Sequence, residues 1–356
     1  MFVIPTLTTG GAERVVSVLA TALTECGQSV CIAKYYSTEN EYPTGDLVTQ
    51  INMFGEGRTI YEKTSYFRKV EKLRKTIMDY KPDYVIPFMF QVAQCVDLAI
   101  KGLNVTVFQS MRIDPAISPK SRIQRLLRDH LVYKSKCTFV QNEKQRQYFR
   151  SNARERIHVL FNPVSDELFN ITPRFENEIY TISSAGRLEK QKNFMLLIDA
   201  FEEAFLENEN VILQIYGEGS EKNKLEDYIA TKKSAQRIRL MGRTNDIAHV
   251  YEHSDLFVLS SDFEGMPNAL IEAMACGLPC VSTDCPTGPS DLIEDKKSGT
   301  LVPVGDVKQM AKALQEMFIR REKGWQMGEI ARETVMRKCK AENIARQMIE
   351  LCESIK

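Results

Sequence analysis

Hydrophobic and polar positions in the first half of this chain alternate between short β-rich runs and stretches with helical periodicity. The runs that predict strands lie at Phe2–Pro5, Val30–Tyr35, Tyr84–Pro87, Val105–Gln109 and Thr138–Gln141. Helical patterns fall between them, beginning near Ala12 and covering about 66–80 and 120–134. This alternation is typical of α/β proteins whose strands form a parallel sheet.

The same rhythm restarts in the second half. Strands are predicted at Tyr180–Ala185, Val211–Tyr216, Ile238–Met241, Leu256–Leu259 and Cys280–Thr283. Helices are predicted at Met195–Phe205, Lys222–Thr231 and 267–276. Two Rossmann-like domains, with parallel sheets facing across a cleft, are the simplest architecture that fits both halves.

Two prolines interrupt the pattern between Asn162 and Pro173, and we expect the domain boundary there. Residues 1–163 then form an N-terminal Rossmann-like domain and residues 164–340 a C-terminal one. The last amphipathic stretch, within 341–356, has a pattern that suits either domain. We expect it to pack back on the N-terminal domain.

Composition places the chain among soluble globular proteins, with 43% hydrophobic and 26% charged residues in 356. It holds no run of 18 apolar residues and no signal-peptide pattern at its start, so we expect a cytoplasmic protein. The nine scattered cysteines indicate reduced thiols. Cys276, Cys280 and Cys285 lie close together without metal-ligand spacing, and we interpret them as small buried residues.

The formal net charge of zero hides an asymmetry between the halves. Residues 1–163 carry 23 Lys and Arg against 15 Asp and Glu, a net charge of +8, and residues 164–356 carry 24 against 32, a net charge of −8. Either only the first half meets an anionic partner or surface, or the difference is chance variation between two domains. We expect no nucleic-acid partner.

One basic segment, residues 118–136, sharpens this question because it holds six cations and one acid. Its apolar stripe is formed by Ile123, Leu126, Leu127 and Leu131. Such a helix can lie on an anionic membrane, which would place the protein at the inner face of the cell membrane. It can equally be a surface helix whose stripe is buried.

The most informative stretch, Ser260–Pro289, follows the predicted strand Leu256–Leu259. α/β folds bind ligands at such positions, beyond the carboxyl end of a strand. Pro267 suits the first turn of the next helix, which places Glu264 in the loop before it and Glu272 in its second turn. Around them, Gly265 lets the backbone approach a ligand, and the amides of Met266, Asn268 and Ala269 form an anion-binding helix N-terminus. In isolation, the two carboxylates could instead simply complement the helix dipole.

Three further loops follow strands of the same half. The sequence SAGRLEKQKN holds Gly186, which permits a turn, and Arg187 and Lys192, which can neutralise a diphosphate. YGEG at 216–219 brings Gly217 and Gly219, and Gly242 precedes Arg243. Because the carboxyl ends of parallel strands meet at one edge of a sheet, the four loops are predicted to converge on a nucleotide-sugar site.

A divalent ion is not expected at this site. The sequence contains no Asp-x-Asp, and the D-x-E pair Asp262 and Glu264 is the remaining arrangement that could hold Mg²⁺. Arg187, Lys192 and the helix N-terminus already supply the positive field that a metal would provide. We therefore expect no cofactor and no metal ligands.

With these loops in order, the chain resembles the family 4 glycosyltransferases, retaining enzymes of the two-domain GT-B architecture. The pattern GRL…KN, then YGxG, then EGxPNxLxEAMACGLPxVSTDCPTGP carries the likeness, which is densest over 184–305. GGAER at 10–14 and NPV at 162–164 add to it. The similarity is strongest to members that build bacterial polysaccharides.

The resemblance implies a role for each matching position. Arg187 and Lys192 would hold the donor diphosphate, and Glu272 would hold the ribose hydroxyls. Glu264 would hold the transferred hexose, together with the amides of Gly265, Met266 and the neighbours of Pro267. Among these, Glu264, Arg187 and Lys192 are the candidate catalytic residues. Gly217 and Arg243 would flank the nucleobase, usually uracil.

On the acceptor side, Gly10 and Gly11 open the first helix, so their amides can meet a phosphate or the transferred sugar; otherwise they form a tight turn without a ligand. Many relatives carry a histidine after the strand that ends near residue 109, but this chain reads SMRIDP there. Arg112 is therefore the candidate for an acceptor or sugar contact, and Asp114 can be a cap before Pro115.

We therefore expect a retaining glycosyltransferase that moves a hexose or an N-acetylhexosamine from a nucleotide diphosphate sugar, with UDP favoured. The acceptor would be a glycan or a polyprenyl-diphosphate-linked glycan in cell-surface polysaccharide synthesis. A UDP-sugar epimerase of GT-B shape would use a similar nucleotide site, a phosphorylase would respond to inorganic phosphate, and a non-catalytic subunit would only bind the donor. An NAD-linked oxidoreductase is disfavoured, because residues 8–13 lack the spaced G-x-G-x-x-G.

Overall fold

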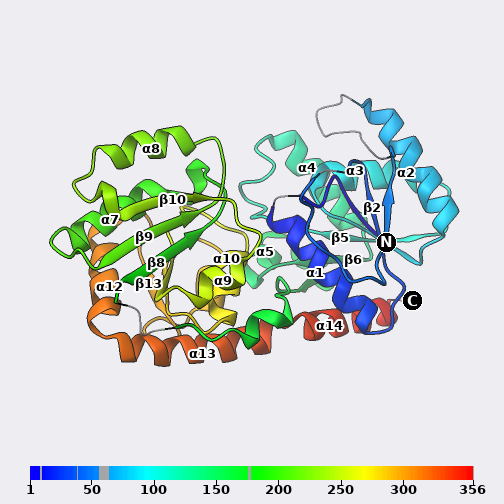
Figure 1. Ribbon diagram of the computed structural model, residues 1–356. Coiled ribbons are helices and arrows are strands. Elements are labelled where there is room, and N and C mark those ends of the chain that lie inside the picture. Colours follow the sequence, from blue (N-terminus) through cyan, green and yellow to red (C-terminus); the bar gives the residue numbers. More distant parts are fainter. Residues whose placement is uncertain (9, 38, 56–63, 175–177, 356) are drawn as a thin grey trace. The chain divides into compact units, whose positions relative to one another are not determined.

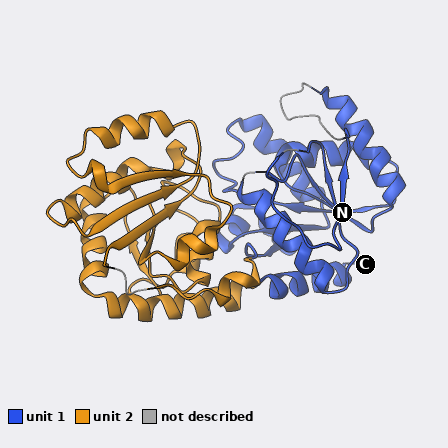
Figure 2. Cartoon of the chain, in the orientation of Figure 1, with its two compact units in different colours: residues 1–163, 341–356 blue, residues 164–340 orange. Residues whose placement is uncertain are grey.

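The structure, a computed structural model, describes residues 1–8, 10–37, 39–55, 64–174 and 178–355. The chain divides into two compact units (Figures 1 and 2). Unit 1 comprises residues 1–163 and 341–356, and unit 2 comprises residues 164–340. The chain passes from unit 1 to unit 2 directly after Pro163, inside the segment where the two prolines interrupt the pattern.

Unit 1 is built on a parallel sheet of seven strands in the order β3-β2-β1-β4-β5-β6-β7. The strands are β1 (Phe2–Ile4), β2 (Cys31–Lys34), β3 (Thr49–Asn52), β4 (Tyr84–Pro87), β5 (Thr106–Ser110), β6 (Cys137–Val140) and β7 (Ile157–Val159). Helices cover both faces, as Figure 1 shows. In β1, Phe2 and Ile4 enter the core on one face while Val3 enters the core on the other, which is the alternation that a strand buried on both sides requires.

The helices of unit 1 follow its strands in chain order. They are α1 (Gly11–Glu25), α2 (Tyr66–Tyr80), α3 (Phe90–Ala99), α4 (Arg122–Lys134), α5 (Glu143–Tyr148), α6 (Ser151–Arg154) and α14 (Ala341–Ser354). The helix α14 packs on α1 and buries Ile344, Ala345 and Met348 in the core of unit 1. The hydroxyl of Tyr84 donates to the carbonyl of Cys352 at 2.8 Å, so the end of the chain completes this unit.

Unit 2 is built on a parallel sheet of six strands in the order β10-β9-β8-β11-β12-β13. The strands are β8 (Tyr180–Ala185), β9 (Val211–Tyr216), β10 (Ile238–Gly242), β11 (Leu256–Leu259), β12 (Cys280–Thr283) and β13 (Thr300–Val302). Loops that follow neighbouring strands of this sheet therefore lie side by side at its carboxyl edge. This is the edge at which the four glycine-containing and charged loops are predicted.

The helices of unit 2 are α7 (Phe194–Phe205), α8 (Lys222–Ala230), α9 (Ile247–Glu252), α10 (Asn268–Ala275), α11 (Pro289–Leu292), α12 (Val307–Ile319) and α13 (Arg321–Cys339). Short 3₁₀ turns lie at η1 (Asp166–Asn170), η2 (Lys190–Lys192) and η3 (Ala235–Arg237). The main core joins α7 and α12 to the sheet, with Phe201, Ile215 and Leu314 fully buried.

Several elements were not expected from the sequence pattern. They are the short strands β3, β7 and β13 and the helices α3, α5, α6, α9, α11, α12 and α13. In α13, Gly324 and Gly328 weaken the helical signal. A side chain at Gly328 would clash with the carbonyl oxygen of Gly277, so close packing of α13 on α10 explains that glycine.

Candidate active site

Helix α10 and the loop before it place the two predicted carboxylates. The helix begins at Asn268, so Pro267 occupies the N-cap position and not the first turn that the sequence favoured. The helix ends in a Schellman motif: Gly277 has φ +75°, its amide donates to Met274 and the amide of Leu278 donates to Ala273. Glu264 in the loop and Glu272 in the second turn are each 7% exposed.

An ion pair joins two of the predicted loops. The Nζ of Lys192 lies 2.6 Å from Oε1 of Glu264, and these side chains are 15% and 8% exposed. The hydroxyl of Ser261 donates to the same carboxylate oxygen at 2.7 Å. A carboxylate that is buried and charged needs such partners, because its desolvation is otherwise uncompensated. The sequence brought Lys192 and Glu264 to one site but did not predict that they contact each other.

Asp262 is engaged in a second link between the same loops. Its Oδ1 accepts from Nδ2 of Asn193 at 2.7 Å, and its amide donates to the carbonyl of Gln191 at 2.9 Å. Asn193 also accepts from the amide of Leu196 and so caps α7. Asp262 and Glu264 are therefore each bonded to the neighbouring loop. This role differs from that of a pair of Mg²⁺ ligands, which their D-x-E spacing allowed.

The glycines of the loops after β8 and β9 allow those loops to pack together. The amide of Gly186 donates to Tyr216, and that of Gly217 donates to Gly242, at 3.0 and 2.8 Å. A side chain at Gly217, whose φ is +145°, would clash with the carbonyl of Gly186, and one at Gly219 would clash with Leu188. These two glycines thus have a packing reason that is independent of any ligand.

Residues of the segment 287–288 support the Glu264 loop from behind and were not among the predicted site residues. The hydroxyl of Thr287 donates to the carbonyl of Glu264. Gly288 has φ +98°, and a Cβ there would lie 2.7 Å from Cδ of Pro267 and 3.0 Å from the carbonyl of Gly265. The Thr-Gly-Pro triplet carries a turn signal, but the contact of Thr287 with Glu264, 23 residues earlier, depends on tertiary structure.

The remaining donor-side positions lie around this centre. Gly265, Met266 and Pro267 are buried, while Asn268 and Ala269 are partly exposed at the start of α10. Arg187 and Arg243 are exposed, each directly after a glycine at a strand end. The structure thus brings the loops of all predicted donor residues to the carboxyl edge of one sheet and leaves two arginine side chains open to solvent there.

At the carboxyl edge of the unit 1 sheet, Arg112 lies in a network of neutral groups. Its Nε donates to Oγ of Ser110 at 2.9 Å, and a terminal nitrogen donates to Oδ1 of Asn162 at 3.0 Å. That oxygen also accepts from Gln141 at 2.9 Å, and the guanidinium lies 5.1 Å from the ring centroid of Phe88. Burial lowers the pKa of Arg112 to about 10. A partly buried guanidinium held by amides and a hydroxyl is well placed to receive an anion.

Gly10 and Gly11 stand at the start of α1 as predicted, but Glu13 alters their surroundings. Gly10 is the N-cap, and Glu13 is three residues into the helix and 8% exposed. The carboxylate of Glu13 lies where a side chain at Gly10 would be, so the chain's own anion occupies the helix N-terminus. A phosphate or sugar that binds these amides has to displace it.

Two other groups of charged residues differ from this site. His249, Glu252 and His253 have ligand atoms within 4.8 Å of one another, and they form the one such group found among the described residues. Glu252 is paired with Arg174 at 2.6 Å, which opposes a metal ion there.

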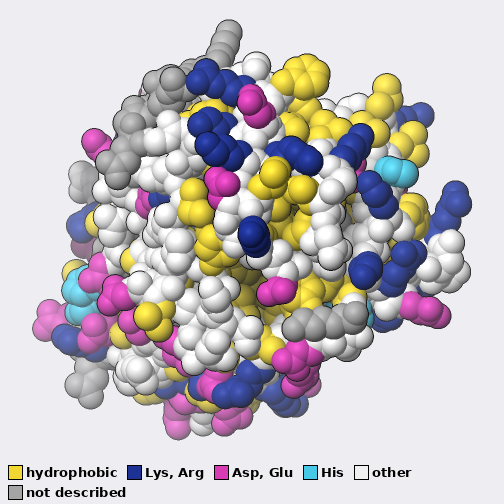
Figure 3. Space-filling view, turned by 90° about the vertical axis from the view of Figure 1, so that its right-hand side faces the viewer, with side chains coloured by type: hydrophobic (Ala, Val, Ile, Leu, Met, Phe, Trp, Pro, Cys, Tyr) yellow, Lys and Arg dark blue, Asp and Glu magenta, His cyan; other side chains and the backbone are white. Residues whose placement is uncertain are grey.

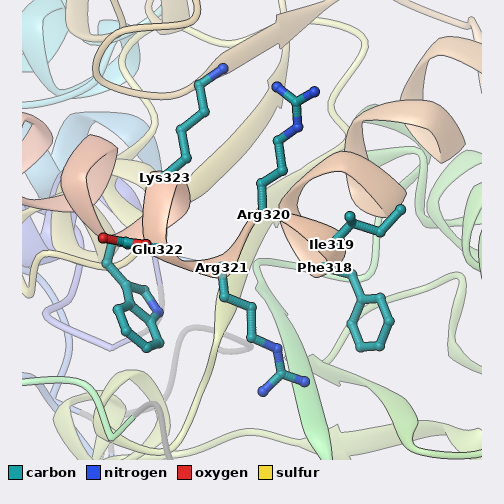
Figure 4. Close-up of a pocket in the computed structure, with 7 residues that line it drawn as sticks. Phe318, Ile319, Arg320, Arg321, Glu322 and Lys323 are labelled. Atoms are coloured by element: carbon teal, nitrogen blue, oxygen red, sulfur yellow. The ribbon is translucent and has the colours of Figure 1, made fainter.

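A surface pocket near the junction of α12 and α13 contains none of the predicted residues (Figure 4). One of its arginines, Arg321, stacks on the rings of Tyr180 and Phe318 at 4.8 and 5.3 Å, so it serves packing.

The nine cysteines are free thiols, and seven are buried. Burial raises the pKa of Cys276 and that of Cys285 to about 12, so both thiols stay protonated. This fits their interpretation as small buried residues.

Across the described part of the chain, every helix is too short or too polar to span a bilayer. Figure 3, which looks onto the side of Figure 1 occupied by unit 1, shows Lys and Arg among exposed hydrophobic side chains.

Comparisons with known proteins show the family and the fold. The family described as glycosyl transferases group 1 matches residues 164–334. A Campylobacter jejuni protein named GalNAc-alpha-(1->4)-GalNAc-alpha-(1->3)-diNAcBac-PP-undecaprenol alpha-1,4-N-acetyl-D-galactosaminyltransferase is 30% identical over 322 residues, covering 88% of this chain and 87% of the relative.

Two solved structures share the fold over nearly all of both chains. A sucrose-phosphate synthase from Thermosynechococcus elongatus has a TM-score of 0.85 at 17% identity and covers 99% of this chain and 98% of its own. HepE of Anabaena, solved in complex with UDP-glucose, has a TM-score of 0.81 at 16% identity with the same coverage. Together with the two parallel-sheet units, these likenesses establish the GT-B fold. The chain therefore belongs to the group 1 glycosyl transferases and is an enzyme that transfers a sugar from a nucleotide-sugar donor.

Proposed function

We propose that this enzyme is a retaining transferase that moves a hexose or an N-acetylhexosamine from a UDP-sugar to a glycan carried on a lipid diphosphate. The carrying observation is the buried pair of Lys192 and Glu264 at the carboxyl edge of unit 2, beside the N-terminus of α10. An acceptor of this kind is supported by the Campylobacter jejuni relative, whose name describes transfer to a glycan on PP-undecaprenol.

In this proposal the donor diphosphate lies over the start of α10. Arg187 is exposed and free to reach a phosphate, and Lys192 contributes the second cation from the neighbouring loop. The backbone from Gly265 to Ala269, at the positive end of the helix, faces the phosphate oxygens. Charge on the departing diphosphate grows as the glycosidic bond breaks, so these groups stabilise the transition state more than the ground state.

The two carboxylates bind hydroxyl groups. Glu264 accepts from the hydroxyls of the transferred sugar, and its contact with Lys192 orients it for that task. Glu272 accepts from the ribose. Gly217, Gly219 and Arg243 border the nucleobase, the two glycines by shaping the loop and Arg243 by its exposed side chain.

The chemical step is a same-face substitution at the anomeric carbon. The bond from that carbon to the diphosphate oxygen breaks, and the acceptor hydroxyl oxygen forms a bond from the side that the diphosphate leaves. The departing diphosphate oxygen takes the acceptor proton, so no protein carboxylate becomes covalently attached. A glycosyl adduct on Glu264, detected by mass spectrometry after a trapped turnover, would contradict this mechanism.

We propose further that the reaction needs no metal ion. The positive field at the diphosphate comes from Arg187, Lys192 and the helix N-terminus, and Asp262 is bonded to Asn193. Activity is expected to be unchanged when EDTA is added after exhaustive dialysis. A loss that is restored by Mg²⁺ or Mn²⁺ would contradict it.

The acceptor side belongs to unit 1. Arg112 is proposed to bind a phosphate or sugar hydroxyl of the acceptor. Its guanidinium is cationic, and the groups that it is bonded to through Ser110, Asn162 and Gln141 are neutral. Gly10 and Gly11 contribute amides once the Glu13 side chain has moved aside. We place the reaction at the cytoplasmic side of a membrane, where nucleotide sugars meet lipid-linked glycans.

The test is a donor screen that uses the full chain. Thermal shifts with UDP, GDP and individual UDP-hexoses identify the base and sugar, and UDP release is then measured with and without a lipid extract. We expect stabilisation by UDP and release that depends on the extract. Stabilisation by GDP alone would indicate guanine as the base of the donor. Conversion of a UDP-sugar to a different UDP-sugar without acceptor would indicate an epimerase.

A further inference from the structure

The first half of helix α4 exposes large apolar side chains. Ile123, Leu126 and Leu127 are 71%, 70% and 46% exposed, and their i, i+3, i+4 spacing puts them on one face. Leu131, the fourth member of the predicted stripe, is 8% exposed and buried with Val132. The interpretation of this segment as a surface helix with a buried stripe is therefore wrong for its first half.

Basic side chains flank these apolar ones. Lys120 and Arg122 are exposed, and Arg125 is partly exposed while donating to the carbonyls of Pro119 and Lys120 at 3.1 Å. The nearby acid Asp129 is paired with Arg128, at a distance of 2.6 Å between Oδ1 and a guanidinium nitrogen. A row of isoleucine and leucine bordered by cations matches the chemistry of an anionic lipid surface, with headgroup phosphates for the cations and acyl chains for the apolar groups.

Arg128 has a different task from the other cations of this helix. It is 6% exposed, donates to the carbonyls of Pro115 and Ser118, and lies 5.1 Å from the ring centroid of Tyr148. These bonds fix the loop that follows Arg112 onto α4. A partner that binds α4 is therefore also connected to the acceptor-side loop, because the buried guanidinium of Arg128 bonds this loop to the helix.

We propose that the surface formed by Ile123, Leu126, Leu127, Lys120, Arg122 and Arg125, here termed the α4 face, docks on an anionic lipid bilayer. A second copy of the chain fits this surface less well. A symmetric contact would set the three cations of one copy against those of the other, which costs free energy. The bilayer offers both complementary charge and a place for the apolar side chains.

Docking of this kind goes beyond the proposed transfer reaction and brings the enzyme to its acceptor. A lipid-linked diphosphate is confined to the plane of the headgroups, and the loop with Arg112 is tied to the helix that enters that plane. The search for an acceptor then becomes two-dimensional. The donor site in unit 2 needs no membrane for its own chemistry.

The test is vesicle co-sedimentation of the purified full chain in the absence of donor and acceptor. Vesicles of phosphatidylglycerol and phosphatidylcholine are compared with phosphatidylcholine alone at low and high salt. We expect binding to the anionic vesicles, weakened at high salt. The variant Ile123→Gln/Leu126→Gln/Leu127→Gln should lower the partition coefficient by about tenfold or more.

A matched control carries the same residue types at positions of similar exposure. Leu47, Leu206 and Ile319 are 76%, 38% and 76% exposed, so Leu47→Gln/Leu206→Gln/Ile319→Gln removes equivalent apolar area elsewhere. We expect the control to bind vesicles like the wild type. Equal binding of the two variants, or no binding by the wild type, would overturn the proposal.

Two further measurements separate the alternatives. Arg122→Glu with Arg125→Glu is expected to abolish the preference for anionic vesicles, and unaltered preference would contradict the role of the cations. Sedimentation velocity detects self-association: a wild-type dimer that the α4 variant loses, without vesicle binding, would assign the face to a second copy. Because no sugar transfer is measured, these outcomes are independent of the donor and acceptor assignments.

Discussion

The carboxyl edges of the two sheets are built differently. In unit 2, the four predicted loops and the segment 287–288 are bonded to one another, and the partly buried cation Lys192 is neutralised by a buried carboxylate. In unit 1, the hydrogen bonds that the partly buried cation Arg112 makes within the described part of the chain go to neutral groups, and a helix near it leaves its apolar face uncovered. The cation at the edge of unit 2 is neutralised without a ligand, and the cation at the edge of unit 1 is not.

This difference fits the ligands that each edge is proposed to bind. A nucleotide diphosphate sugar has a fixed set of charges, so a rigid, preorganised site lowers the reorganisation needed in the transition state. A lipid-linked glycan varies along its length and is presented by a surface. An edge with an uncompensated cation and an exposed helix gains most of its stabilisation when that partner arrives.

The largest expected effect tests the preorganised edge. Lys192→Ala removes the partner of Glu264 and one cation at the diphosphate, and we expect kcat for sugar transfer to fall by about 100-fold or more. Lys190→Ala, an exposed lysine in the same turn, is the matched control and should leave kcat within about twofold. Initial rates of UDP release measure both. A similar loss in the two variants would show that the ion pair has no special part.

A second experiment separates loop packing from ligand contact. Gly217→Ala should destabilise the fold by about 3 kcal/mol, because the methyl group meets the carbonyl of Gly186 at a φ of +145°. Gly102→Ala has a φ of +75° but open space around it, and should cost about 1 kcal/mol. Chemical denaturation gives both values. Equal costs would mean that the loop after β8 moves aside freely.

The incomplete edge is tested by Arg112→Met. Removal of a partly buried cation whose hydrogen-bond partners in the described residues are neutral should leave stability unchanged or slightly higher, because its desolvation penalty disappears. The KM for the acceptor should rise by about tenfold. Arg150→Met, at an exposed arginine of the same unit, is the control. A large loss of stability with an unchanged acceptor KM would make Arg112 a structural residue.

The smallest effect concerns a buried acid at the opposite edge of the unit 2 sheet. Burial raises the pKa of Asp255 from 3.8 to about 6, and its carboxylate accepts from the amide of Thr181 at 2.7 Å. Between about pH 4 and pH 6 the unfolded group is already ionised while the folded group keeps its proton, so the free energy of unfolding falls as pH rises.

The variant Asp255→Asn keeps the acceptor and removes the charge. At pH 8 it should raise the free energy of unfolding by about 1 kcal/mol after allowance for partial solvent screening. The gain should shrink toward pH 4, where the folded wild-type carboxyl is protonated. Chemical denaturation at the two pH values measures this difference. A gain that is the same at both pH values would contradict the raised pKa.

The sequence predicted those parts of the fold that depend on local pattern. Tyr180–Ala185, Val211–Tyr216 and Leu256–Leu259 were predicted with the bounds that the structure has, because each is a short β-rich run beside a helical pattern. The strand β3 reads TQIN and is exposed or partly exposed, and β7 has three residues, so neither gives an apolar run that could be recognised.

The site was predictable as a set of loops but not as a set of contacts. Residues that follow parallel strands must meet at one edge, so Lys192 and Glu264 could be placed together from the order of elements alone. Their ion pair, and the support of Glu264 by Thr287, depend on loop conformations that no spacing specifies. In α4 the pattern found an apolar stripe, but which part of it is covered depends on tertiary packing, which buries Leu131 and leaves Ile123 exposed.

The position of α14 has a consequence for how the protein is made. Unit 1 needs Ile344, Ala345 and Met348 in its core and Cys352 beside Tyr84, yet these residues follow the whole of unit 2 in the chain. Unit 2 is continuous in the chain, whereas unit 1 lacks residues 341–356 until synthesis has passed through the whole of unit 2. The N-terminal unit, although synthesised first, has to wait with an open hydrophobic face, and this interval is when the nascent chain most needs protection from aggregation.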